Sequence, residues 1–196
     1  FIRVLEPEKC LTNTISEFNK LYNASFDIIF KDPRHIDPGL VEREIEKINK
    51  KITFPENDFF EDYKFYKFLH LRQLSYYKND EAVIRKNFTD KEILYKNPAY
   101  SQLLLKEYGT FMFEEDNDTL LKILPITENW NSINNFLTRN NKYLNKEFRE
   151  YFLCINLYKL FYKTPVHQKK IIHILKTAES SGMNEYNKKI IKAVLK

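Results

Sequence analysis

Glycine, cysteine and methionine are scarce in this chain, whose 196 residues include 3 Gly, 2 Cys and 2 Met. Average usage would give about 14 Gly in this length. Gly39, Gly109 and Gly182 are too far apart to build a G-x-G-x-x-G or G-x-x-x-x-G-K-S/T phosphate loop. The shortage therefore excludes the usual nucleotide-binding enzymes, collagen-like chains and most hairpin-rich all-β folds.

Long apolar runs are also missing. The longest uncharged stretches, such as residues 152–158, are far shorter than the roughly 20 apolar residues that a membrane span needs. The sequence opens at Phe1 without a basic and apolar leader, so we expect any targeting signal to lie outside it.

The two cysteines, Cys10 and Cys154, are too far apart in sequence to form a C-x-x-C redox motif or a zinc knuckle. A disulfide between them stays open if the compartment is oxidising. Cys154 falls inside a strongly apolar helical pattern, where a free buried thiol is the commoner outcome.

Histidines and acids offer no metal or catalytic motif. No two of the four histidines have the i, i+3 or i, i+4 spacing of a helical metal site; they are His35, His70, His167 and His173. The acidic run 114–118 lacks the central Gly and the later ligands of an EF-hand, so we interpret it as a turn that caps a helix beginning at Thr119. We predict no catalytic, cofactor-binding or metal-binding residue in this chain, and no cofactor.

Positive charge is concentrated at the end of the chain. The net charge is +5, yet the last 38 residues carry 9 Lys against Glu179 and Glu185. Such a segment can bind nucleic acid or an anionic surface, through Lys169, Lys170, Lys188, Lys189 and Lys192. The absence of Arg from this segment instead favours a solvated helix face with lysines near helix ends, and disfavours nucleic acid as a partner.

Helix start signals recur about every 20 residues. Pro follows a capping residue at Asp37-Pro38, Asn97-Pro98 and Thr164-Pro165. Capping-box spacing occurs at Asp58/Glu61 and Thr89/Glu92, and further candidate caps are Asn117, Asn145 and Asn184. These signals predict starts near residues 37, 58, 79, 97, 117, 145, 164 and 184.

Apolar residues between these starts keep helical periodicity, for example Leu11, Ile15, Phe18 and Tyr22. We therefore predict an all-α fold, an irregular stack of antiparallel helical hairpins with about eight to nine helices and no strict TPR or HEAT repeat. Residues 8–196 are expected to form a single helical domain, and residues 1–7 an extended segment. Because Gly is rare, Asn is expected to supply left-handed helix ends, at Asn79, Asn140 and Asn141.

Four segments carry a resemblance to a known family: residues 7–23 (PEKCLTNTISEFNKLYN), 59–74 (FFEDYKFYKFLHLRQL), 93–113 (ILYKNPAYSQLLLKEYGTFMF) and 136–162 (FLTRNNKYLNKEFREYFLCINLYKLFY). They resemble the helical region that precedes the thioredoxin-like domain in TlpA-type thiol-disulfide oxidoreductases of some Gram-negative cell envelopes. The most specific piece is Leu94-Tyr95 followed by Asn97-Pro98-Ala99-Tyr100.

The resemblance implies a non-catalytic helical scaffold or partner-recognition domain in the cell envelope or periplasm. The W-C-x-x-C redox motif of the family has no counterpart in this sequence, so the full-length protein would carry any thiol-disulfide activity elsewhere. The expected partner is a protein, a peptide or a thioredoxin-like domain of the same polypeptide, with membrane contact only through a lipid anchor outside this chain. The alternative is a free-standing helical-hairpin module that binds a protein or peptide and has no redox connection.

Overall fold

The structure is a computed structural model that describes residues 7–52, 57–75, 80–89, 91–113, 118–140 and 145–196. These residues form ten α-helices, one π-helical turn and one 3-10 turn, and none of them forms a strand. The all-α prediction is therefore confirmed. Of the extended segment expected at residues 1–7, residues 1–6 lie outside the described residues, and Pro7 is instead the first residue of α1.

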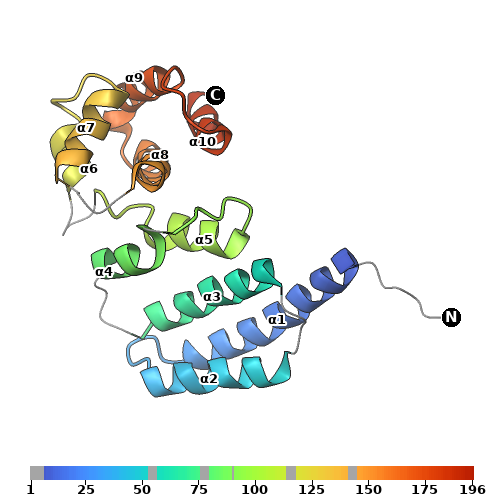
Figure 1. The fold of residues 1–196 in the computed structure, drawn as a ribbon. Helices are drawn as coiled ribbons and strands as arrows, with labels where there is room; N and C mark the ends of the chain where they lie inside the picture. Colours follow the sequence, from blue (N-terminus) through green and yellow to red (C-terminus); the bar gives the residue numbers. More distant parts are fainter. Residues whose placement is uncertain (1–6, 53–56, 76–79, 90, 114–117, 141–144) are drawn as a thin grey trace. The chain divides into compact units, whose positions relative to one another are not determined.

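Figure 1 shows the helices in chain order, coloured from blue at α1 to red at α10. Their bounds are α1 Pro7–Ile29, α2 Pro38–Lys51, α3 Asp58–Gln73, α4 Asp80–Ile84, the π-helical η1 Arg85–Thr89, α5 Pro98–Glu107, α6 Thr119–Ile123, α7 Trp130–Asn140, α8 Lys146–Lys163, the 3-10 turn η2 Pro165–His167, α9 Gln168–Ala178 and α10 Glu185–Leu195.

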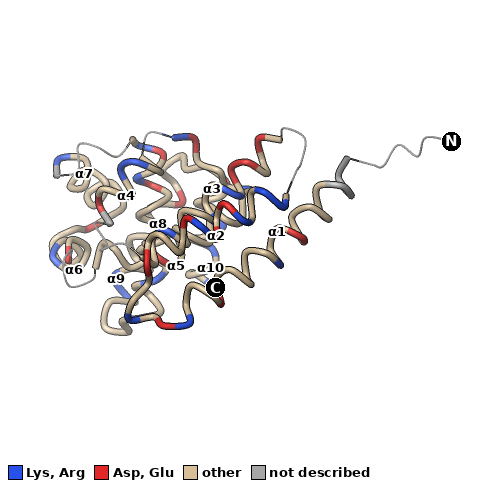
Figure 2. The backbone as a smooth tube through the Cα atoms, turned by 90° about the horizontal axis from the view of Figure 1, so that it is seen from below, with Lys and Arg blue, Asp and Glu red and all other residues tan. Residues whose placement is uncertain are grey.

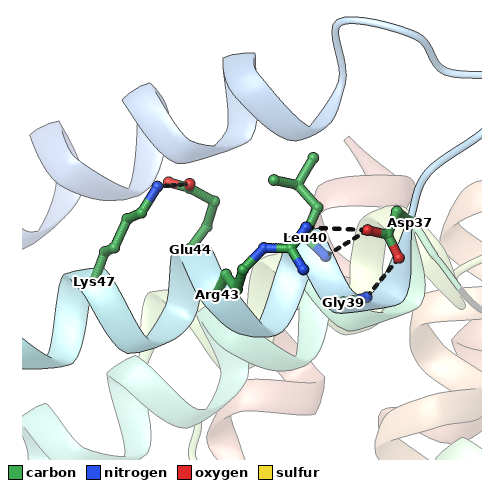
Figure 3. Close-up of polar contacts among 6 residues, drawn as sticks. All are labelled: Asp37, Gly39, Leu40, Arg43, Glu44 and Lys47. Atoms are coloured by element: carbon green, nitrogen blue, oxygen red, sulfur yellow. Dashed lines mark hydrogen bonds and ion pairs between the residues drawn. The ribbon is translucent and has the colours of Figure 1, made fainter.

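Side-chain caps define several of the helix starts that the sequence predicts. Asp37 accepts hydrogen bonds from the N–H groups of Gly39 (2.8 Å) and Leu40 (3.1 Å) at the start of α2 (Figure 3). Asn145 accepts from Phe148 N–H at 2.8 Å, and Asn184 accepts from Asn187 N–H at 2.9 Å. These side chains satisfy backbone donors that have no partner within the helix.

Three capping predictions are corrected by the structure. Thr89 is the last residue of η1, where its hydroxyl donates to Ile84 O (3.4 Å), so no helix starts there. At the start of α3 the cap is Asn57, which accepts from Phe60 N–H at 3.0 Å, and Asp58 is already helical. Thr164 precedes η2 but makes no side-chain cap hydrogen bond.

Asparagine does not replace glycine at left-handed positions in the described part of the chain. Gly182, with φ of 74°, is the one described residue with positive φ, and Asn140 is the last residue of α7. Asn79 and Asn141 lie outside the described residues. The side-chain oxygens of Asn57, Asn97, Asn145 and Asn184 instead accept hydrogen bonds from backbone N–H groups at helix starts.

The structure divides into two compact units, each made from two segments of the chain. Unit 1 contains residues 1–78 and 96–103, and unit 2 contains residues 79–95 and 104–196. Residues 8–196, which are expected from the sequence to form a single helical domain, therefore contribute to both units.

Unit 1 is built on α1, α2 and α3, which pack against one another. Phe18 is fully buried and lies edge-on to Phe60 and Tyr63, with both ring centroids 5.8 Å away. The first part of α5 belongs to this unit, because the ring of Tyr100 lies edge-on to Tyr66 with centroids 4.9 Å apart.

Unit 2 is organised around α8, which packs against α7, α9, α10 and η1. Its residues from Phe148 to Leu157 are all buried except Glu150, which is half-buried. Two buried polar residues, Arg149 and Asn156, interrupt this apolar helix. Asn156 accepts from Met112 N–H at 2.9 Å and thereby fixes the turn that follows α5.

Candidate functional site

Aromatic side chains form a partly exposed row along α1 and at the residue that follows it, Phe30. Tyr22, Phe26 and Phe30 are spaced by four residues, which places them on one face of the helix. Tyr22 is buried (4% exposed), Phe26 is half-buried and Phe30 is 41% exposed. The Phe26 and Phe30 rings are stacked with centroids 5.3 Å apart and planes 13° from parallel. The row thus becomes more exposed towards the end of α1.

Helix α3 extends this row with an imidazole and an ammonium group. The His70 ring is stacked 6.0 Å from Phe26, and its Nδ1 lies 2.5 Å from the Tyr22 hydroxyl oxygen. The Lys67 ammonium group lies over the Tyr22 ring, 4.3 Å from its centroid, which is cation–π geometry. We call Tyr22, Phe26, Phe30, Lys67 and His70 the aromatic strip.

Tyr63 on α3 lies next to the strip, with the Lys67 ammonium group 5.9 Å from its ring centroid. Its hydroxyl donates to Asn19 Oδ1 on α1 at 2.8 Å, which joins the two helices. Burial raises the pKa of Tyr63, and the hydrogen bond with Asn19 offsets part of that effect. The phenol therefore stays neutral, and its contact with Asn19 joins α3 to α1 one turn before Tyr22.

The buried carboxylate of Glu44 on α2 joins this helix to α1 through Ser25 and also pairs with Lys47 of α2. Glu44 is 3% exposed, and its carboxylate accepts from Ser25 Oγ at 3.0 Å. It also accepts from Lys47 Nζ at 2.5 Å, the contact drawn in Figure 3. Burial by itself raises the pKa of Glu44, but the hydrogen bonds from Lys47 and Ser25 and the charges of Lys47 and Arg43 outweigh it, so the pKa is lowered. Both carboxylate oxygens have partners, and the group holds the helices together.

The residues considered as metal ligands in the sequence are scattered. The histidines lie in the connection before α2, in α3, in η2 and in α9. The described part of the chain contains no group of three His, Cys, Asp or Glu side chains able to hold a metal ion. Within the acidic run, residues 114–117 lie outside the described residues, and Asp118 precedes α6 and pairs with Lys122 at 2.6 Å. The predicted helix start at Thr119 is confirmed.

Cys154 on α8 is a free thiol that is buried in the core of unit 2 (1% exposed), as the apolar pattern predicts. Burial, with a smaller contribution from the charge of Glu150, raises the pKa of its thiol. The side chain of Cys10 lies outside the described residues. A thiol of this kind is a poor nucleophile, because the thiolate is the reactive form.

Tyr95 joins the starts of α8 and α10 in unit 2. Its ring stacks on Tyr186 with centroids 4.4 Å apart and planes 4° from parallel. Its hydroxyl donates to Glu147 Oε1 (3.1 Å) and accepts from Asn184 Nδ2 (2.5 Å). Burial is the main cause of its raised pKa, to which the negative charge of Glu147 adds. This part of the Leu94–Tyr100 motif therefore has a structural role.

The rest of that motif acts in unit 1. Asn97 caps α5 by accepting from the N–H groups of Ala99 (3.1 Å) and Tyr100 (3.3 Å). Its amide also donates to Phe59 O at 3.4 Å.

Comparison with known proteins gives no relative: no family model matches the chain, and no curated protein or solved structure matches it significantly. Within the described residues, every helix is too short or too polar to cross a lipid bilayer. The aromatic strip thus rests on its own geometry, and the TlpA-type resemblance stays a hypothesis. The sequence pattern places Tyr22 and Phe26 on one helical face, but it does not distinguish core positions from the exposed end at Phe30.

Proposed function

We propose that this chain is a non-catalytic helical domain that recognises a protein or peptide partner through the aromatic strip. The observation that carries the proposal is the exposed end of the strip, where the 41% exposed Phe30 stacks on Phe26 beside His70. Large aromatic side chains held rigidly by their neighbours are typical anchors of protein interfaces.

The exposed part of Phe30 is large enough to matter for affinity. Aromatic side chains bury about 150–250 Å² each, so covering the exposed 41% of Phe30 removes roughly 80 Å² from water. At about 25 cal/mol per Å² this contributes about 2 kcal/mol, or roughly 30-fold in Kd. Stacking on Phe26 pre-orders the ring, which reduces the entropy lost on binding.

Lys67 and His70 supply the polar side of the strip. The Lys67 ammonium lies over Tyr22, and the His70 ring is stacked against both Tyr22 and Phe26 (6.4 and 6.0 Å between centroids). An apolar anchor residue of the partner fits against Phe26 and Phe30, with a carbonyl or carboxylate towards the ammonium group.

We further propose that the domain belongs to a TlpA-type envelope protein whose redox domain lies outside this sequence. Support comes from the four resembling segments alone: residues 59–74 largely coincide with α3, and residues 136–162 contain most of α8. The free-standing module would use the same aromatic strip.

Selection from a displayed peptide library tests the recognition function. Peptides enriched on the full chain are expected to bind the Phe30→Ala variant about 10- to 30-fold more weakly. Phe65→Ala is the matched control, because Phe65 lies in the same unit, is 38% exposed and contacts Tyr66 edge-on. Failure to enrich any peptide, or equal loss of affinity in both variants, would remove the aromatic strip as the binding site.

The complete gene tests the redox connection separately. A leader upstream and a W-C-x-x-C motif downstream are the expected findings. An open reading frame that lacks both would leave the free-standing module as the function.

A further inference from the structure

The end of α8 carries two exposed apolar side chains next to a concentration of lysines. Tyr162 is 59% exposed, and Val166 in η2, at 80%, is the most exposed large apolar side chain among the described residues. The Tyr162 hydroxyl donates to Ala193 O at 3.3 Å, which places the end of α8 beside the last turn of α10.

The geometry separates positive from negative charge along these helices. Tyr186 near the start of α10 lies against Tyr95, which also contacts Tyr151 in the first half of α8, and Ala193 lies beside Tyr162. Helices α8 and α10 therefore run in the same direction. Glu185 is at the opposite end of α10 from Tyr162, where it pairs with Lys188 at 2.7 Å.

Glu179 also lies away from Tyr162. It follows α9, which starts next to η2 and ends ten residues later at Ala178. The segments around Tyr162 and Val166 carry Lys163, Lys169, Lys170, Lys192 and Lys196, with no acid between residues 159 and 178 or between 186 and 196. Lysines recur along α9 and α10 in the charge-coloured trace (Figure 2).

Helix stability does not account for all of these lysines. Lys163 and Lys192 lie in the last turns of α8 and α10, where the helix dipole favours a positive charge. Lys169 and Lys170 instead lie in the first turn of α9, which has no acidic residue and no side-chain cap. Positive charge is unfavourable at a helix N-terminus, so these two lysines oppose the helix that carries them.

We propose that Tyr162, Val166, Lys163, Lys169, Lys170 and Lys192, here called the basic end, bind an acidic segment of a partner protein that also carries an apolar anchor. Charge complementarity selects an acidic occupant, and Tyr162 and Val166 provide the apolar contact. A peptide fits better than nucleic acid, because residues 159–196 contain no Arg for bidentate contacts to phosphates or bases. The basic end lies in unit 2 and the aromatic strip in unit 1, so this inference is independent of the proposed function.

Fluorescence anisotropy with a labelled amphipathic peptide of Glu and Leu tests the proposal on the full chain. Binding is expected at low salt and should weaken by about tenfold or more between about 50 and 300 mM salt, because exposed charges are screened. Lys169→Glu/Lys192→Glu should weaken it by a further tenfold or so, and Tyr162→Ser/Val166→Ser by about fivefold. The control Lys20→Glu/Lys50→Glu, which makes the same charge change on exposed residues of unit 1, should bind like the unmodified chain.

The same titration is run with short duplex DNA and with vesicles containing about 30% phosphatidylserine. Tighter binding of either probe than of the peptide would overturn the proposal and assign the basic end to that class of anion. Absence of peptide binding, or equal affinity in the Lys169→Glu/Lys192→Glu variant, would also overturn it. Trp130 is 1% exposed in unit 2, so an unchanged emission spectrum shows that unit 2 is folded in the variants of the basic end. Far-UV circular dichroism checks the folding of the unit 1 control.

Discussion

Asn156 and Asn187 are both fully buried in unit 2, but their hydrogen bonding differs. Asn156 accepts from Met112 N–H (2.9 Å), and its amide donates to Phe152 O (3.0 Å) and Tyr108 O (3.4 Å). The side-chain oxygen and nitrogen of Asn187 have no hydrogen-bond partner in the described structure. The same substitution, Asn→Ala, should therefore affect stability differently at the two positions.

The loss of stability expected for Asn156→Ala comes mainly from the backbone group that loses its hydrogen-bond partner. Met112 N–H would be left buried without an acceptor, which costs about 1–3 kcal/mol. The small cavity adds roughly 0.5–1 kcal/mol, and the better helix propensity of Ala returns up to about 0.7 kcal/mol. We expect Asn156→Ala to reduce the free energy of unfolding by about 1.5–3 kcal/mol.

At Asn187 the propensity gain is the same and no hydrogen bond is lost. Removing two polar atoms that are buried without partners is itself favourable by about 1 kcal/mol or more. The cavity offsets part of this, so we expect Asn187→Ala to leave the free energy of unfolding unchanged or to raise it by about 1 kcal/mol.

Urea unfolding followed by tryptophan fluorescence measures this difference. Trp130 is the single tryptophan of the chain and lies buried in unit 2, together with both asparagines. The midpoints should move without a change in slope. Equal destabilisation of the two variants would show that the hydrogen bond between Asn156 and Met112 N–H does not contribute measurably to the free energy of unfolding.

Further substitutions test individual contacts. Asn57→Ala should destabilise α3 by about 1 kcal/mol, measured by circular dichroism, because Phe60 N–H loses its cap. Glu44→Gln should lower the free energy of unfolding by about 1–3 kcal/mol at neutral pH. Because the pKa of Glu44 is lowered in the folded chain, the unmodified protein loses this stabilisation as the pH falls below about 4.5. The free energy of unfolding of the variant should therefore depend less on pH in that range. Gly182→Ala should cost about 1 kcal/mol in urea unfolding, and Gly182→Asn less, because φ is 74° and nothing lies near the added Cβ. Cys154 should resist a thiol reagent in the native protein and react after unfolding, as peptide mapping by mass spectrometry would show, because burial raises its thiol pKa.

The helical fold was predictable because its signals are local. Asp37-Pro38 and Asn97-Pro98 mark true helix starts, since a capping side chain and a proline act within one turn. The predicted helix start at Thr89 is wrong because tertiary contacts decide the local structure there. Thr89 is 1% exposed and ends a π-helical turn, and its carbonyl accepts a hydrogen bond from the side-chain amide of Asn145, which is distant in sequence.

The candidate surfaces could be predicted only in part. The spacing of Tyr22 and Phe26 indicates a common face, but the placement of His70 and Lys67 against that face depends on how α3 packs on α1. Likewise, the number of lysines near the end of the sequence can be read from the sequence. The position of Tyr162 beside the last turn of α10 depends on how α8 and α10 pack and is seen only in the structure.

Each unit is built from two segments that are separated in sequence by a segment of the other unit, and this affects how the chain folds during synthesis. The backbone passes from one unit to the other after residue 78, again after residue 95 and a third time inside α5, after Leu103. No single cut in the gene can therefore yield either unit intact. During synthesis unit 1 lacks its final segment until residues 96–103 have left the ribosome, after the first part of unit 2 has already emerged. A fragment ending at residue 78 would expose the face of Tyr66 that Tyr100 covers, so fragments intended to isolate a binding surface need to keep the chain through α5.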